Sequence, residues 1–191
     1  MLKVILVGYP GSQFLVPASR YLAQKYLPGF DLHWLNYVGD KDGWSKFIGT
    51  YLTNFQDELV IFALDDYLLG GSLNQQVYDY ALESFKYDSD VVAVKLFECT
   101  SEEHDDYPVT TQYTIWRREK LIELMTLTKD PWHFEITGSN IFEAKGWKSV
   151  HLYPALKYNT SSALSNRWSG VRWDGVSEED REYIKNNNLI I

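Results

Sequence analysis

The chain has few of the features that mark secreted or membrane-spanning proteins. Only one of its 191 residues is a cysteine, Cys99, so no internal disulfide can form, which is typical of a reducing compartment. The apolar run near the N-terminus, in MLKVILVG, is too short for the core of a signal peptide. No stretch approaches the ~20 apolar residues that cross a bilayer. We therefore expect a cytoplasmic protein without a transmembrane segment.

Basic residues are also scarce. The 18 Lys and Arg residues are outnumbered by 26 Asp and Glu residues, which gives a net charge of −8. This balance argues against broad, nonspecific attraction to polyanions, although it leaves room for a local basic patch. Hydrophobic residues make up 45% of the chain and aromatic residues 16%, so a sizeable core is available and some rings are expected on a binding surface. We expect one domain over residues 1–191.

Several familiar catalytic motifs are missing. The turn GYPGS, residues 8–12, lacks the Lys-Ser/Thr ending of a P-loop and does not fit GxGxxG. A GxSxG nucleophile elbow is absent, and so is a Cys/His cluster with zinc spacing. ATPase, dehydrogenase and α/β-hydrolase functions therefore lose their usual support, and a plain strand-to-helix turn remains an alternative for GYPGS.

Hydrophobic periodicity predicts alternating strands and helices. Strands are expected at residues 3–7, 31–38, 59–64, 90–97, 109–116 and 149–156. Helices are expected at residues 12–27, 44–55, 72–85, 117–127 and 177–187, the third opened by a capping box of Ser72 and Gln75. The alternation over the first ~100 residues predicts an α/β fold with a mostly parallel central sheet flanked by helices.

Polar segments follow three of the expected strands, at residues 8–12, 39–43 and 65–72. In open α/β sheets, ligands bind at the carboxyl ends of the strands. The third segment begins with Asp65 and Asp66, directly after the unbroken apolar run LVIFAL, which suggests a strand buried on both faces. Adjacent side chains of a strand point to opposite sides, so one carboxylate can take Mg²⁺ or Mn²⁺ while the other bonds a ligand hydroxyl. The alternative is that Asp66 caps a loop and Asp65 pairs with an arginine.

A second candidate patch is DPWHFEITGSN, residues 130–140. Glu135 stands between aromatic residues, which predicts a raised pKa and a role as general base. The alternative is a glutamate near a helix N-terminus that interacts with the helix dipole, with packed aromatic neighbours. Among the histidines, we expect His33 to be structural. We do not expect a metal site at His104, in an acidic loop. His151, on the last strand, is a candidate third metal ligand, and the alternative is a hydrogen-bonded core histidine.

Two blocks of sequence resemble glycosyltransferases of the GT-A type. GWSKFIGTYLTNFQDELVIFALDDYLLGGSLN, residues 43–74, is similar to bacterial capsular-polysaccharide sugar transferases and related phage enzymes, which carry a Trp-Ser helix and a strand that ends in Asp-Asp-Tyr/Phe. QYTIWRREKLIELMTLTKDPWHFEITGS, residues 112–139, resembles their second block. Together the blocks cover about a third of the chain.

The resemblance implies a GT-A-like (Rossmann-like) domain that transfers a sugar from a nucleotide-sugar donor, with a UDP-sugar as the first guess and Mn²⁺ or Mg²⁺ on its diphosphate. It places the donor in residues 1–100 and the acceptor in residues 101–191. Asp66 would ligate the metal, Asp65 would contact the ribose or the metal, and Glu135 would deprotonate the acceptor. The other implied donor-side residues are Gly8, Tyr9, Pro10, Gly11, Asp40, Trp44 and Lys46. The implied acceptor-side residues are Trp132, His133, Gly138 and Ser139. His151 matches the C-terminal metal histidine of some members.

The acceptor stays open at this point. A polysaccharide is one option, and a hydroxymethylated base in phage DNA is another. For DNA, a local basic and aromatic surface would be formed by Arg117, Arg118, Arg167, Arg172, Trp168 and Trp173. Two alternatives of other classes are a non-catalytic nucleotide- or glycan-binding module and a nucleotidyltransferase. Because the chain is short for this fold, a large acceptor, a partner, or peripheral or oligomeric association is expected to complete the site.

Overall fold

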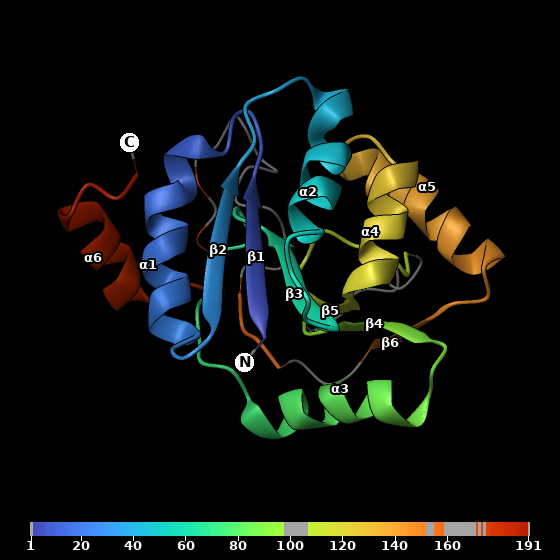
Figure 1. Cartoon of the computed structure of the whole chain (residues 1–191). Helices are drawn as coiled ribbons and strands as arrows, with labels where there is room; N and C mark the ends of the chain where they lie inside the picture. Colours follow the sequence, from blue (N-terminus) through green and yellow to red (C-terminus); the bar gives the residue numbers. More distant parts are fainter. Residues whose placement is uncertain are drawn as a thin grey trace.

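The fold is built on a central six-stranded sheet (Figure 1). A computed structural model describes residues 2–97, 107–151, 155–158, 171, 173 and 175–190. The strands are β1 (Lys3–Gly8), β2 (Asp31–Asn36), β3 (Leu59–Leu64), β4 (Val91–Lys95), β5 (Thr114–Arg117) and β6 (Lys148–His151). Their order across the sheet is β2-β1-β3-β5-β4-β6.

The sheet is mostly parallel, as the alternation of elements predicts. β1 pairs in parallel with β2 and β3, and β4 pairs in parallel with β6. Only β5 is antiparallel to both of its neighbours, β3 and β4. The carboxyl ends of β1, β2 and β3 therefore lie at one edge of the sheet, and the segment that enters β5 arrives at that same edge.

Helices cover both faces of the sheet. The α-helices are α1 (Val16–Tyr26), α2 (Trp44–Leu52), α3 (Gln75–Tyr87), α4 (Arg118–Leu127), α5 (Pro131–Ala144) and α6 (Glu178–Asn186). Short 3₁₀ turns, η1 (Gln13–Leu15) and η2 (Lys41–Gly43), precede α1 and α2. In Figure 1, α2, α4 and α5 group on one side, α6 lies outside α1, and α3 lies apart at the bottom of the view. In the described part of the chain, no helix is both long and apolar enough to cross a bilayer.

The strand before the Asp pair forms as predicted. β3 has the expected bounds, and every residue after Leu59 is buried. Apolar side chains on both faces of the strand explain this, because each face is covered by a packed layer. The single α/β domain expected from the sequence is therefore present.

Four expected strands are shorter than predicted: those at 31–38 and 90–97 become β2 and β4, and the two largest differences are in β5 and β6. The strand expected at 109–116 begins only at Thr114, because the backbone of Thr111 is used elsewhere: its carbonyl accepts from Leu64 N at 2.9 Å and its N–H donates to Glu135 at 2.7 Å. The strand expected at 149–156 ends at His151, and residues 152–154 lie outside the described part.

The expected helices do not include α5, although the alternative interpretation of Glu135 places it near a helix N-terminus, and one cap is misplaced. Asp130 caps α5 by accepting from the backbone N–H of His133 at 2.8 Å, and Pro131 occupies the first helical turn, which is a favoured start. α3 begins at Gln75, and its cap is Asn74, whose side chain accepts from Val77 N, so the capping box of Ser72 does not form.

A buried carboxylate ties α6 to α1. Asp180 has no exposed surface and accepts hydrogen bonds from Lys25 Nζ at 2.7 Å, Tyr21 Oη at 2.9 Å and Ser177 Oγ at 2.8 Å, and also from the hydroxyl of Tyr26. Burial by itself raises the pKa of Asp180, but these hydrogen bonds outweigh it and hold the pKa at about 2. The charged form is therefore the one that the fold stabilises.

Acid should weaken the hydrogen bonds that the Asp180 carboxylate accepts between α6 and α1. Because the folded pKa of Asp180 lies below its unfolded value near 3.9, its contribution is complete above about pH 5 and is lost as the pH falls toward 2. We expect Asp180→Asn to lower the free energy of unfolding by about 2–4 kcal/mol at pH 7 and by clearly less at pH 3. Urea unfolding at both pH values measures this, with the exposed neighbour change Glu179→Gln as the control. Equal losses at the two pH values would contradict it.

Candidate functional site

The Asp pair lies where β1, β3 and the segment before β5 meet. Asp65 N donates to Val7 O at 3.0 Å, and Leu64 N donates to Thr111 O at 2.9 Å. The two carboxylates therefore follow β3 at the edge of the sheet where the loops after β1 and β2 also lie. This is the edge at which ligands bind in open α/β sheets.

Asp65 is 1% exposed. Among the described residues, neither of its carboxylate oxygens accepts a hydrogen bond of good geometry. Burial first, and then the neighbouring charge of Asp66, raise the pKa of Asp65 to about 7, partly offset by the nearby Ser12 hydroxyl. No arginine pairs with it in the described part of the chain, so the arginine-paired alternative is wrong there. Gly8 makes room for this carboxylate, because a Cβ at that position would lie 2.8 Å from Asp65 Oδ2.

Asp66 is fully buried, and a residue of the turn after β1 contacts it. Its Oδ2 accepts a hydrogen bond from the Tyr9 hydroxyl at 3.0 Å. The turn itself is held by Ser12, whose hydroxyl accepts from Tyr9 N and donates to Tyr9 O. Pro10 and Gly11 are exposed at its tip, where Gly11 has a φ of 109°, a value that favours glycine. The predicted donor-side turn is therefore built against the predicted metal ligand.

Glu135 is held beside the same strand end. Its Oε1 accepts from the N–H and from the hydroxyl of Thr111, each at 2.7 Å, and Thr111 is the residue bonded to Leu64 at the end of β3. Burial, followed by the charges of Glu135 and Asp66, raises the pKa of Tyr67 well above its usual range. The buried phenol of Tyr67 is therefore close enough to both Glu135 and Asp66 to respond to their charges.

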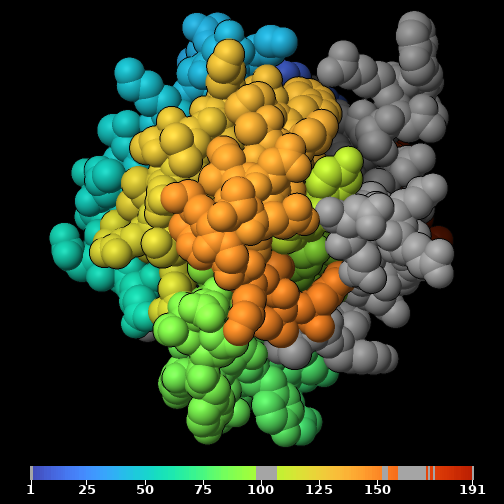
Figure 2. All heavy atoms as spheres, turned by 90° about the vertical axis from the view of Figure 1, so that its right-hand side faces the viewer, coloured from blue at the N-terminus to red at the C-terminus, as the bar shows by residue number. Residues whose placement is uncertain are grey.

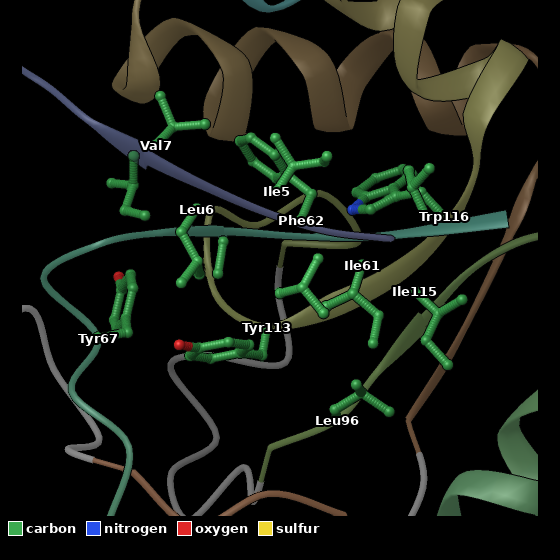
Figure 3. Packing of buried hydrophobic residues seen from close by; sticks show 14 of the residues in the cluster. Ile5, Leu6, Val7, Ile61, Phe62, Tyr67, Leu96, Tyr113, Ile115 and Trp116 are labelled. Carbon is green, nitrogen blue, oxygen red and sulfur yellow. The ribbon is translucent and has the colours of Figure 1, made fainter. Parts of the chain in front are cut away.

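Aromatic rings form one side of this edge. Figure 3 shows the rings of Tyr67 and Tyr113 on the same side of the strands as Leu6, opposite to Trp116. Burial, followed by the charges of the Asp pair, raises the pKa of Tyr113 well above its usual range. Tyr113 is itself buried, so the charges of the two carboxylates act on it in surroundings where electrostatic interactions are stronger than in water.

Two of the predicted acceptor-side residues support the segment before β5. Glu135, Gly138 and Ser139 lie on one face of α5, because they are three and four residues apart. Ser139 is buried and its hydroxyl accepts from Val109 N at 3.2 Å, while a Cβ on Gly138 would lie 3.3 Å from the side chain of Val109. In contrast to Gly138 and Ser139, the predicted acceptor-side residue Trp132 is 59% exposed. His133 is half-buried beside it.

The remaining donor-side predictions have different outcomes. Asp40 caps η2 by accepting from Gly43 N at 2.9 Å, at the expected sheet edge. Lys46 is exposed and, with Gly43, lines an open groove of about 420 Å³. Trp44 is 1% exposed and packs edge-on against Phe62 and Phe134, so the structure places its indole in the core.

The fold does not bring the two predicted metal ligands, His151 and Asp66, close together. His151 is on β6, three strands from β3, which corresponds to about 14 Å across the sheet. Its Nε2 lies 2.9 Å from the carbonyl oxygen of Phe97. No three metal-ligating side chains cluster among the residues that the structure describes. The donor set at the strand end nevertheless fits a hard divalent cation, because two buried carboxylates meet there and the oxygens of Asp65 lack strong protein donors.

Arg117 and Arg118 do not contribute to the basic surface predicted for DNA binding. Arg117 ends antiparallel β5 and Arg118 begins α4, at the sheet edge opposite to the Asp pair. Arg117 pairs with Glu58 at 2.6 Å and donates to backbone carbonyls, and Arg118 donates to Asp57 O. Their guanidinium groups are thus occupied by structural contacts. Four other positions named in the predictions lie outside the described residues: His104, Arg167, Trp168 and Arg172.

Sequence reasoning missed Thr111, which holds Glu135 in place, and Tyr67, a buried phenol whose pKa responds to the charges of Glu135 and Asp66. Thr111 and Tyr67 were assigned no role, although TTQ and the Tyr after the Asp pair were visible in the sequence. The available signal was polarity: threonines at the start of an expected strand can satisfy a buried carboxylate. Their role depends on contacts between residues 24 and more positions apart, which periodicity does not reveal.

Comparisons with known proteins support the fold. No family model and no curated protein matches the chain. A cytidylyltransferase from Leptospira borgpetersenii serovar Hardjo-bovis matches with a TM-score of 0.52 at 12% identity, over 99% of this chain and 95% of that one. A glycosyltransferase involved in glycosylation of the major capsid of PBCV-1 matches with a TM-score of 0.50 at 14% identity, over 80% and 81%. A197 from STIV matches with a TM-score of 0.52 at 12% identity, over 83% and 84%.

These matches define the class of fold. The chain is a single α/β domain of the kind shared by GT-A-like glycosyltransferases and nucleotidyltransferases. At these identities the likeness is one of fold, and the two kinds of transferase match about equally well. The choice between them has to come from the site.

Proposed function

We propose that the protein is a nucleotide-sugar-dependent glycosyltransferase. The observation that carries the proposal is the position of Glu135, a third carboxylate anchored through Thr111 to the end of β3, beside Asp65 and Asp66 but separate from them. A metal-binding pair needs no such residue, whereas transfer to a hydroxyl needs a base close to the donor.

On the donor side, Asp66 would hold the divalent cation and Asp65 would face the ribose or the cation. The bound cation supplies positive charge that neutralises the diphosphate of the donor, for which a UDP-sugar is the first candidate. Tyr9 orients Asp66 through its hydroxyl, and Gly8 leaves the space that Asp65 occupies. The exposed Gly11 turn and the Asp40 loop at the same edge are the proposed contacts of the nucleotide.

On the acceptor side, Glu135 would take the proton of the attacking hydroxyl. All hydrogen bonds that the described residues make to this carboxylate go to Oε1, so Oε2 is the proposed base. The acceptor oxygen forms a bond to the anomeric carbon, the bond from that carbon to the diphosphate oxygen breaks, and the diphosphate leaves with the electron pair. A base on the acceptor side favours inversion. The proposed acceptor is a polysaccharide or a hydroxymethylated DNA base, with Trp132 as the exposed ring beside it.

Nucleotidyl transfer is the second candidate, because a cytidylyltransferase shares the fold. That chemistry places a triphosphate against the first loop and calls for basic side chains there. The loop at residues 9–12 is Tyr-Pro-Gly-Ser and has neither lysine nor arginine. The site therefore favours the glycosyltransferase.

A thermal-shift screen of nucleotide sugars and nucleoside triphosphates, each with and without Mn²⁺, tests the proposal. We expect Tm to rise with a UDP-sugar in the presence of Mn²⁺, and we expect UDP release in the presence of an acceptor or by slow hydrolysis. Pyrophosphate release from a triphosphate and a sugar phosphate would support the nucleotidyltransferase instead. Binding of a nucleotide sugar without any turnover would support a non-catalytic module.

A further inference from the structure

We propose that the groove along α3 is a second binding site, for a neutral, extended glycan. The groove has a volume of about 710 Å³ and is open to solvent. Its lining residues are Gln76, Val77, Tyr80, Glu83, Ser84, Tyr87, Asp88, Val91 and Val150. Pockets of roughly 300–1,000 Å³ with an apolar floor and a few polar groups are typical of small-ligand sites.

The groove is remote from the Asp pair. It reaches Val91, where β4 begins, whereas Asp65 follows the carboxyl end of β3, and β4 runs in the same direction as β3. The two sites therefore lie toward opposite edges of the sheet. Figure 2 shows the C-terminal part of α3, in yellow-green, on the same side of the molecule as α5 and the β6 region, in orange.

One helical stripe supplies four of the lining residues. Gln76, Tyr80, Ser84 and Tyr87 recur at steps of three and four residues, which places them on one face of α3. Tyr80 is 56% exposed and Tyr87 is 85% exposed, although both are large aromatic residues. Core packing therefore does not account for these rings.

The spacing of the two tyrosines suits consecutive sugar rings. Seven residues of helix separate them, which is about 10 Å along the axis and returns the side chains to nearly the same side. That span is comparable to a disaccharide unit of an extended glycan. The C–H faces of sugar rings stack on aromatic rings, while sugar hydroxyls bond carboxylates and amides, here those of Glu83 and Gln76.

Charge selects the kind of occupant. Among the described residues, no lysine or arginine lines the groove, and its two charged members, Glu83 and Asp88, are acidic. Two cations lie nearby: Lys148 is bonded to Asp88 at 2.7 Å, and Arg117, which donates to Val91 O, pairs with Glu58 at 2.6 Å. An anionic glycan would be repelled. A second copy of the chain is also disfavoured, because a two-fold interface sets the same patch against itself and would bring the Glu83 side chains together.

Affinity electrophoresis in native gels tests the proposal, with dextran, laminarin or arabinogalactan as neutral probes and alginate as the anionic one. We expect at least one neutral polymer to retard the protein and alginate not to. The double variant Tyr80→Ala/Tyr87→Ala should weaken the retardation by about tenfold or more in apparent Kd. The matched double variant Tyr80→Phe/Tyr87→Phe keeps both rings and should bind as the unchanged protein does.

Several outcomes would overturn the proposal: no retardation by any neutral polymer, equal retardation by alginate, or equal loss in the phenylalanine variant. Light scattering tests a further outcome. If the unchanged protein is a dimer and the alanine variant is a monomer, the groove is a self-association surface and the proposal is wrong. Glu135→Gln should leave polymer binding intact, and the alanine variant should leave the Tm rise with UDP-sugar and Mn²⁺ intact. These two variants distinguish a failure of the glycan-binding proposal from a failure of the proposed transferase activity.

Discussion

Replacing Glu135 with glutamine should lower kcat for sugar transfer by about 10²–10⁴-fold, the range typical of a lost general base. Glutamine retains a carbonyl oxygen that accepts from the N–H and hydroxyl of Thr111, so the link between α5 and the end of β3 can persist. What the substitution removes is the ability to take a proton. Initial rates of UDP release with a saturating acceptor measure the effect.

The matched control is Glu143→Gln, an exposed glutamate later on α5. It should leave kcat unchanged. The Glu135→Gln variant should keep the full Tm rise with UDP-sugar and Mn²⁺, because the donor is bound by other residues. An unchanged kcat would contradict the assignment of the base, and loss of the Tm rise would show that Glu135 serves the donor or the fold instead.

Replacing Asp66 with asparagine should abolish the Mn²⁺-dependent part of the Tm rise and lower transfer by at least ~100-fold. Asparagine has nearly the same volume and can still accept the hydrogen bond from the Tyr9 hydroxyl. The variant also relieves the repulsion between two adjacent buried carboxylates, one of the causes of the raised pKa of Asp65. We therefore expect its Tm without metal to equal or exceed that of the unchanged protein.

Asp79→Asn is the control for this experiment, because Asp79 is an exposed aspartate on α3, away from the loops proposed to contact the nucleotide. Its Mn²⁺-dependent Tm rise should be unaffected. A Mn²⁺ response that survives in Asp66→Asn would show that the cation, if it binds, is held elsewhere. A fall in Tm of the metal-free variant would assign Asp66 a structural role.

Local patterns predicted the elements that lead to the site. The run LVIFAL followed by two aspartates identified β3, its burial and the position of the carboxylates, because an unbroken apolar run of strand length has few other solutions. α5 was missed because its apolar side chains do not follow a single stripe: Phe134 and Phe142 are buried, whereas Ile136 is exposed. Its Asp-Pro start was the signal that could have revealed it.

Aromatic residues show the limit of such reasoning most clearly. Trp44 and Trp132 looked equally suitable for ligand contact, yet Trp44 fills the core and Trp132 is largely exposed. The difference depends on which face of each helix meets the sheet. An aromatic ring can serve in a core or on a surface, so only the packed arrangement separates the two roles.

By itself, the sequence determined the α/β class, the edge of the sheet at which polar loops collect, and the Asp pair at the end of a buried strand. These depend on periodicity and on the rule that parallel strands end at one edge. Only the tertiary structure decided that Thr111 joins Glu135 to that strand end, that His151 stays with Phe97, and that Arg117 faces the opposite edge. Each of these depends on a contact between residues far apart in the chain, and such contacts are set by the packing of whole elements.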